Sequence, residues 1–140
     1  MLLMWTDNLS VGVKNFDEDH KRMIRMINEL HVAIEDVDEA GNMAEDEVEI
    51  ALHRLENYIQ YHCIVEERLM EQTGYPELRD HRKEHQGFTK NIAEMAQRFR
   101  GSQDPKHAME LMQFMYGWLT EHIFVTDRKY SQHLQSKGFS

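Results

Sequence analysis

Seven histidine and carboxylate side chains in this sequence have types and spacings suited to binding metal ions. They are His20, His62, Glu66, His81, His85, His122 and Asp127. The five histidines interrupt apolar stripes at positions where helical spacing predicts burial, and one buried histidine alone would be an ordinary core residue. His62 and Glu66 are four residues apart, as are His81 and His85, so each pair lies on one helix face, one turn apart.

Five imidazoles and two carboxylates are too many ligands for one metal ion. Two ions of roughly six-coordinate geometry offer about 12 positions, and the seven side chains with one bridging solvent oxygen leave about one position open. This arithmetic favours three histidines on one ion and two on the other. The open position on the second ion would then accept a small ligand.

The elements that must position these side chains are helices, because no stretch shows the alternation of a half-buried strand. Apolar spacing predicts helices at about 17–37, 45–72, 76–100 and 105–135, preceded by an N-terminal arm at 1–16. Asp17 is a candidate N-cap, Gly74 suits a helix end, and Pro76 suits a helix start. Short connections predict an all-α, up-down-up-down antiparallel four-helix bundle, in which counting brings the candidate ligands to one level.

One spacing requires a local distortion. His122 and Asp127 are five residues apart, which is about 140° around a regular helix. Both side chains can point inward only if the helix is locally irregular. We therefore expect a π-type bulge at this position, a feature often found at functional sites.

Composition limits the class of protein. The 140 residues carry 16 Lys+Arg against 25 Asp+Glu, a net charge of −9, without a basic run that could neutralise nucleic acid. The apolar opening 1–5 is too short for a signal peptide or a membrane span. Cys63 is the single cysteine, in agreement with a reducing compartment. We expect one domain spanning 1–140, a cytoplasmic location and a monomer, with no nucleic-acid or membrane partner.

The order His20, then His62-x-x-x-Glu66, His81-x-x-x-His85 and His122-x-x-x-x-Asp127 resembles the hemerythrin family in its single-domain bacterial form. The resemblance covers nearly the whole chain, including Trp5 in the arm and Tyr75-Pro76 before the third helix. Ferritin-type di-iron bundles differ, because they use Glu-x-x-His pairs and no histidine here has a Glu three residues earlier.

The resemblance implies a cofactor of two iron ions with a bridging oxo or hydroxo group. It places His81, His85 and His122 on one iron. It places His20 and His62 on the other, with Glu66 and Asp127 as bridges and O₂ as the ligand of the second iron. It also implies an O₂ pocket lined by Met23, Ile24, Cys63, Leu119 and Ile123, although plain core packing predicts the same apolar residues.

The function implied by the resemblance is non-enzymatic, reversible O₂ binding for transport, storage or sensing. The alternative is a di-iron enzyme that acts on peroxide or nitric oxide with the same ligands. A third possibility is a zinc-stabilised or metal-free helical bundle. Metal analysis and air–argon cycling separate the three, and the sequence identifies no protein recipient of the O₂.

Several residues beside this pattern have ordinary interpretations. Cys63 stands where the bacterial family usually has Phe, and it is either an inert buried thiol or a gap that opens the pocket to water. Glu67 is expected to be solvated or to lie just outside the ligands. The remaining histidines are expected at the surface or the bundle ends; they are His31, His53, His107 and His133.

Overall fold

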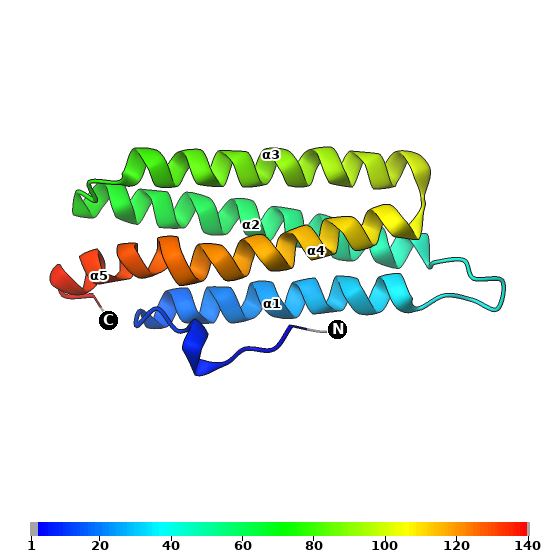
Figure 1. The fold of residues 1–140 in the computed structure, drawn as a ribbon, viewed down its shortest axis with the longest axis horizontal. Coiled ribbons are helices and arrows are strands. Elements are labelled where there is room, and N and C mark those ends of the chain that lie inside the picture. Colours follow the sequence, from blue (N-terminus) through cyan, green and yellow to red (C-terminus); the bar gives the residue numbers. More distant parts are fainter. Residues whose placement is uncertain (1–2, 140) are drawn as a thin grey trace.

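The computed structural model describes residues 3–139, except for the side chains of Ile123 and Phe124. Its helices are a 3₁₀ turn η1 (Asp7–Leu9), α1 (Lys14–Glu35), α2 (Glu45–Thr73), α3 (Leu78–Ser102), α4 (Pro105–Glu121), the π-helix η2 (His122–Asp127) and α5 (Arg128–Ser136). Figure 1 shows α1, α2 and α3 as three antiparallel rods, and α4, η2 and α5 as a continuous fourth. The predicted all-α, up-down-up-down bundle is confirmed.

Glycine and proline set the helix ends much as expected. Gly74 ends α2 in the left-handed conformation (φ 69°), which costs glycine little. Pro105 is the first residue of α4, and the Asp104 carboxylate caps it by accepting a hydrogen bond from the Lys106 amide at 3.0 Å. Pro76 lies in the turn two residues before α3 begins, so the third helix starts later than expected.

The start of the first helix was predicted wrongly. α1 begins at Lys14 with Val13 in the N-cap position, so Asp17 lies inside the first turn. The Asp17 carboxylate accepts hydrogen bonds from the Val11 amide at 2.8 Å and from the Ser10 hydroxyl at 2.5 Å. It therefore fastens the N-terminal arm to the helix instead of capping it.

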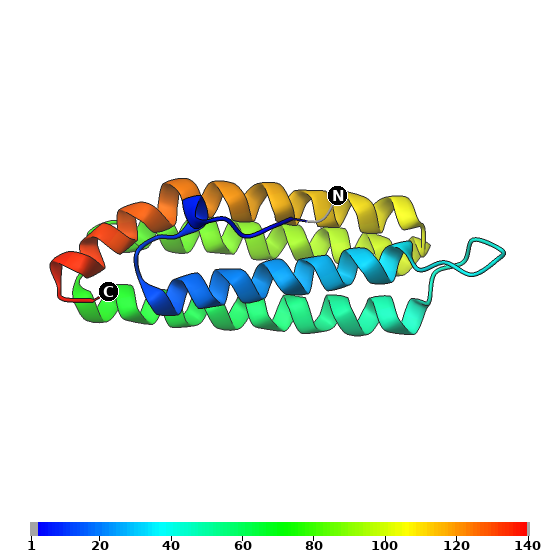
Figure 2. The same cartoon turned by 90° about the horizontal axis from the view of Figure 1, so that it is seen from below.

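The N-terminal arm is part of the fold. Figure 2 shows it running alongside α1 and α4. The Asn28 side chain binds both the amide and the carbonyl of Leu3, at 3.0 and 2.8 Å, and accepts a hydrogen bond from the Tyr116 hydroxyl at 2.8 Å. These contacts join the arm to both helices.

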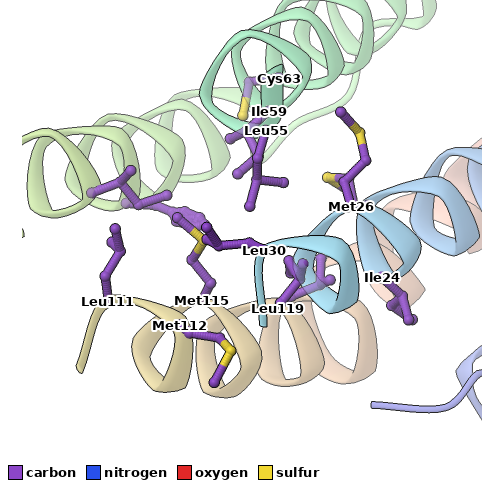
Figure 3. Close-up of a cluster of buried hydrophobic side chains, with 14 of the residues drawn as sticks. Ile24, Met26, Leu30, Leu55, Ile59, Cys63, Leu111, Met112, Met115 and Leu119 are labelled. Atoms are coloured by element: carbon purple, nitrogen blue, oxygen red, sulfur yellow. The ribbon is translucent and has the colours of Figure 1, made fainter. Parts of the chain in front are cut away.

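The larger part of the hydrophobic core fills the bundle on one side of the polar layer described below, and Met70, Tyr130 and Leu134 continue it on the other side. Figure 3 shows Leu30, Leu55 and Met115, among others, extending from α1, α2 and α4 toward one another. All three are at most 1% exposed. In the described part of the chain no helix is both long and apolar enough to cross a membrane.

Candidate metal centre

The structure brings all seven predicted ligand residues into one buried layer. Each is at most 3% exposed, and they come from α1, α2, α3 and η2. They form two groups whose potential ligand atoms lie within 4.8 Å of one another: Glu66, His81, His85 and His122 in one, and His20, His62, Glu66 and Asp127 in the other. We call these the three-histidine and two-histidine groups.

Glu66 directs one oxygen at each group. Its Oε1 is in close contact with His81 Nε2 and lies 3.5 Å from His85 Nε2 and 3.7 Å from His122 Nε2. Its Oε2 lies 2.8 Å from His62 Nε2. The two carboxylate oxygens therefore face different histidine sets, as a bridging ligand requires.

Asp127 has the same division. Its Oδ1 lies 2.9 Å from His122 Nε2 and 3.5 Å from His81 Nε2, while its Oδ2 lies 2.9 Å from His20 Nε2. The two groups thus share two carboxylates, one from α2 and one from η2. The histidine split of three and two is the one that the ligand arithmetic favours.

The polar atoms of this layer are close but poorly hydrogen-bonded. Among the described residues, ten buried side-chain nitrogen and oxygen atoms lack a hydrogen-bond partner. Nine of them belong to His20, His62, Glu66, His81 and Asp127, including both oxygens of each carboxylate. Buried polar groups are almost always paired, so such a concentration requires an explanation. The unpaired atoms are explained if these side chains direct their lone pairs at metal ions.

The π-helix η2 explains how His122 and Asp127 can both face inward. It covers His122–Asp127, and its hydrogen bonds span five residues instead of four, which matches the spacing of the two side chains. The predicted distortion of the fourth helix is confirmed.

Three further carboxylates orient the histidines from outside; Glu67 was expected in such a position, whereas Asp19 and Glu84 were missed. The Nδ1 atoms of His62, His85 and His122 lie 3.4, 3.1 and 3.2 Å from carboxylate oxygens. Their partners are, in order, Asp19, Glu67 and Glu84. A carboxylate on Nδ1 fixes the ring orientation and makes the other nitrogen a more basic ligand.

These outer carboxylates are themselves held in place. Asp19 accepts a hydrogen bond from the Tyr58 hydroxyl at 2.7 Å, and Glu84 accepts one from the Thr126 hydroxyl at 2.9 Å. Glu67 accepts a hydrogen bond from Arg82 Nε at 2.9 Å. The expectation that Glu67 lies just outside the ligands fits this geometry.

Electrostatics favour charged pairs in the layer. Burial would lower the pKa of His62, but the Glu66 and Asp19 carboxylates outweigh it and raise the pKa to about 10. Burial would also lower the pKa of His122, but the Asp127 carboxylate outweighs it, and the pKa is well above its usual value. The pKa of Glu66 is well below its usual value, because its histidine neighbours outweigh burial. Without metal, protons on imidazoles can balance the carboxylates.

An apolar cavity of about 10 Å³ lies beside His62. Of the residues expected around an O₂ pocket, Met23, Cys63 and Leu119 line it. Ile24 does not, because it lies one residue further around α1, on the side away from Cys63 (Figure 3). The side chain of Ile123 lies outside the described residues. The other lining residues, which sequence reasoning missed, are Ile27, Ile59, Phe88, Met115 and Trp118.

Two side chains define the chemistry of this cavity wall. Burial raises the pKa of the Cys63 thiol, which keeps it neutral and unreactive. The Trp118 ring stacks on the His122 imidazole with ring centres 4.3 Å apart. It also stacks on the Phe88 ring, with ring centres 3.5 Å apart. The small volume and apolar lining fit a diatomic molecule better than bulk water.

The remaining histidines lie apart from the layer. His31 was expected at the surface or a bundle end; it lies four residues before the end of α1, where it is buried (3% exposed) and its Nε2 lies 2.7 Å from Glu35 Oε1. His133 lies at the bundle end, where its Nε2 donates a hydrogen bond to the Thr73 carbonyl at 3.0 Å. The part of the chain described here contains no further metal-type cluster.

Comparisons with known proteins agree with this geometry. Residues 11–134 match the family model described as the hemerythrin HHE cation binding domain. A bacteriohemerythrin of Stenotrophomonas maltophilia is 35% identical over 96% of this chain and 83% of its own length. One from Clostridium acetobutylicum is 25% identical over 92% and 98%. A crystal structure of a leucine-to-phenylalanine mutant superposes with a TM-score of 0.81 at 26% identity, covering 96% of this chain and 98% of that one.

Proposed function

Since the chain belongs to the hemerythrin family, we propose that it binds O₂ reversibly at a non-haem di-iron centre, for oxygen transport, storage or sensing. The observation that carries the proposal is the pair of buried ligand groups that share Glu66 and are also joined by Asp127, whose two oxygens face His20 and His122. Two separate metal sites would not need both carboxylates between them.

Each residue has a defined part in the proposal. His81, His85 and His122 would hold one iron, His20 and His62 would hold the other, and the carboxylates of Glu66 and Asp127 would bridge the pair. Two ferrous ions would supply the electron pair that reversible O₂ binding requires. The histidine-rich donor set suits iron, because imidazole is a good ligand for it.

The surroundings of the two-histidine group support binding of a small apolar molecule. Its ion has fewer protein ligands, and the apolar cavity lies beside His62. Apart from the proposed ligand His62, the wall of that cavity consists of apolar side chains such as Met23 and Leu119. Such a wall admits O₂ but disfavours water and ions, which helps to protect ferrous iron from irreversible oxidation.

The decisive experiment is an optical spectrum of the iron-loaded, reduced protein during cycles of air and argon. We expect about two iron ions per chain and a spectrum that appears in air and disappears in argon. Rapid turnover of peroxide or nitric oxide without a stable oxygenated spectrum would favour the enzyme instead. One zinc ion, or no metal at all, after preparation with excess iron would contradict the di-iron proposal.

Matched variants on α2 sharpen the test. His62→Ala removes one of the two histidines on the proposed O₂-binding iron, and it should abolish the reversible spectrum. His53→Ala removes an exposed histidine of the same helix and should leave the spectrum unchanged. Equal spectra for the two variants would exclude His62 from the site. A cytoplasmic location and a monomeric state stay predictions.

A further inference from the structure

A second cavity, of about 290 Å³, lies at the surface near the turn between α2 and α3. It is lined by Tyr75, Glu77, Asp80, His81, Glu84, Val125, Thr126 and Lys129. The apolar cavity instead involves Ile59 and Phe88, which lie on the other side of the ligand layer along the bundle axis. We call the second one the acidic cavity. The two cavities approach the layer from opposite ends.

The charge of the acidic cavity favours cations. Asp80 and Glu84 lie on the face of α3 that also carries His81, and Glu77 precedes them in the N-cap position of that helix. Lys129 is the one lysine or arginine among the lining residues. Three carboxylates against one ammonium make a negative surface that concentrates positive ions. Oxygen ligands of this kind bind hard divalent cations while leaving part of their water shell in place.

His81 connects this cavity with the buried layer. It lines the acidic cavity and is only 2% exposed, and its Nε2 is in close contact with Glu66 Oε1. Its other ring nitrogen, Nδ1, is buried without a hydrogen-bond partner. The other two histidines of its group each have a carboxylate on Nδ1. A buried, unpaired ring nitrogen on a residue that lines an acidic cavity is a second, independent indication of a cation at this place.

We propose that the acidic cavity captures ferrous ions from solution and passes them by way of His81 to the buried centre. Glu77 and Asp80 are exposed and act as the capturing carboxylates, whereas Glu84 is held by His122 and Thr126. This inference rests on the proposed di-iron function. It assigns loading of the metal to one cavity and access of O₂ to the other.

The test is the rate at which the metal-free protein takes up ferrous iron without O₂, measured as iron that resists a rapidly added chelator. The double variant Glu77→Gln, Asp80→Asn should load about tenfold more slowly at low ionic strength, because electrostatic steering is lost. The difference should shrink as salt screens the cavity. The final iron content and the final optical spectrum should equal those of the wild type.

The matched control is Asp46→Asn, Glu47→Gln, which removes two exposed acids from the first turn of α2 at the other end of the bundle. Both double variants lose the same charge and a similar interaction with a helix terminus. The control should load at the wild-type rate. Equal rates in the two double variants would overturn the inference.

A second variant covers the case in which the first does not fold. Lys129→Gln removes the ammonium from the acidic cavity and should accelerate loading, and an unchanged or slower rate would overturn the inference. The final iron content tests the di-iron function separately from the loading route. Normal final iron content with equal rates rejects only the loading route, whereas a wild-type chain that retains no iron rejects both the route and the di-iron function.

Discussion

The two halves of the bundle interior use the same helices in opposite ways. In one half, Leu30, Leu55 and Met115 meet in an apolar core that needs no partner beyond itself (Figure 3). In the other half, next to a smaller apolar cluster that includes Tyr130 and Leu134, five imidazoles and two carboxylates occupy positions of equal burial. The comparison teaches that burial alone does not decide what stabilises a layer. The apolar half is stabilised by removal from water, and the polar half depends on what balances its charges and lone pairs.

The largest effect should follow substitution at the residue that joins the two ligand groups. Glu66→Ala removes an oxygen from both groups at once, so the protein should lose most of its bound iron. Metal analysis after preparation with excess iron measures this loss. Glu71→Ala, at an exposed position of the same helix, should retain the wild-type content. Full iron content in Glu66→Ala would show that the polar half does not depend on this bridge.

The next effect separates the two halves by stability. Leu55 is fully buried, and Leu55→Ala should lower the free energy of unfolding by about 2–5 kcal/mol because it leaves a cavity. The loss should be similar with and without iron, and the iron content should stay unchanged. Chemical denaturation gives the free energies, with Ile50→Ala at an exposed position as the control. A loss seen only in the iron-loaded protein would contradict the independence of the two halves.

A smaller effect is expected from the carboxylates outside the ligands. Glu84→Gln keeps the shape of the side chain but removes the charge that faces His122 Nδ1. Iron affinity should fall about 10–100-fold, as is typical when such a partner is lost. Competition with a chelator at equilibrium measures it. Glu94→Gln, exposed on the same helix, should keep the wild-type affinity, and equal affinities would mean that His122 needs no outer partner.

The last expected effect concerns pH and the metal-free protein. The pKa of His62 rises from 6.5 to about 10 on folding, so its protonation stabilises the folded state fully below pH 6.5, and this stabilisation is lost as pH rises toward 10. The melting temperature of the metal-free protein should therefore fall over that range. With iron bound the imidazoles are neutral ligands, so the same fall should be absent.

Thermal melting between pH 6 and 10 checks this expectation. His62→Ala without metal should show a shallower fall than the metal-free wild type, because it lacks the group that releases the proton. A metal-free protein whose melting temperature rises over the same range would contradict the charge balance described for the polar half.

The sequence predicts the ligand layer well because periodicity and chemistry agree there. His122 and Asp127 can both face the interior only through an irregular turn, so even the π-helix follows from their spacing. For His31 the sequence indicates the place but not the exposure. A histidine near the end of α1 can be exposed or buried, and only the packed structure shows that it is buried.

The outer carboxylates and the cavity walls are harder to predict. Asp19 and Glu84 are two of 25 acidic residues, and nothing in their local sequence shows that they reach a histidine on another helix. Those contacts depend on how each helix is rotated about its axis. The same rotation decides that Met23 lines the apolar cavity while the adjacent Ile24 does not.

The π-helix also sets the rotational phase of the end of the chain. A regular α-helix built from the same residues would turn Asp127, Tyr130 and Leu134 by about 100° around the axis. The wide turn absorbs one extra residue, so Tyr130 and Leu134 remain fully buried. If one residue were deleted from η2, the segment could form a regular α-helix and Tyr130 and Leu134 would still face inward. An insertion into α4 would instead rotate every inward side chain that follows it. The number of residues in this segment therefore constrains the protein as strictly as their identity.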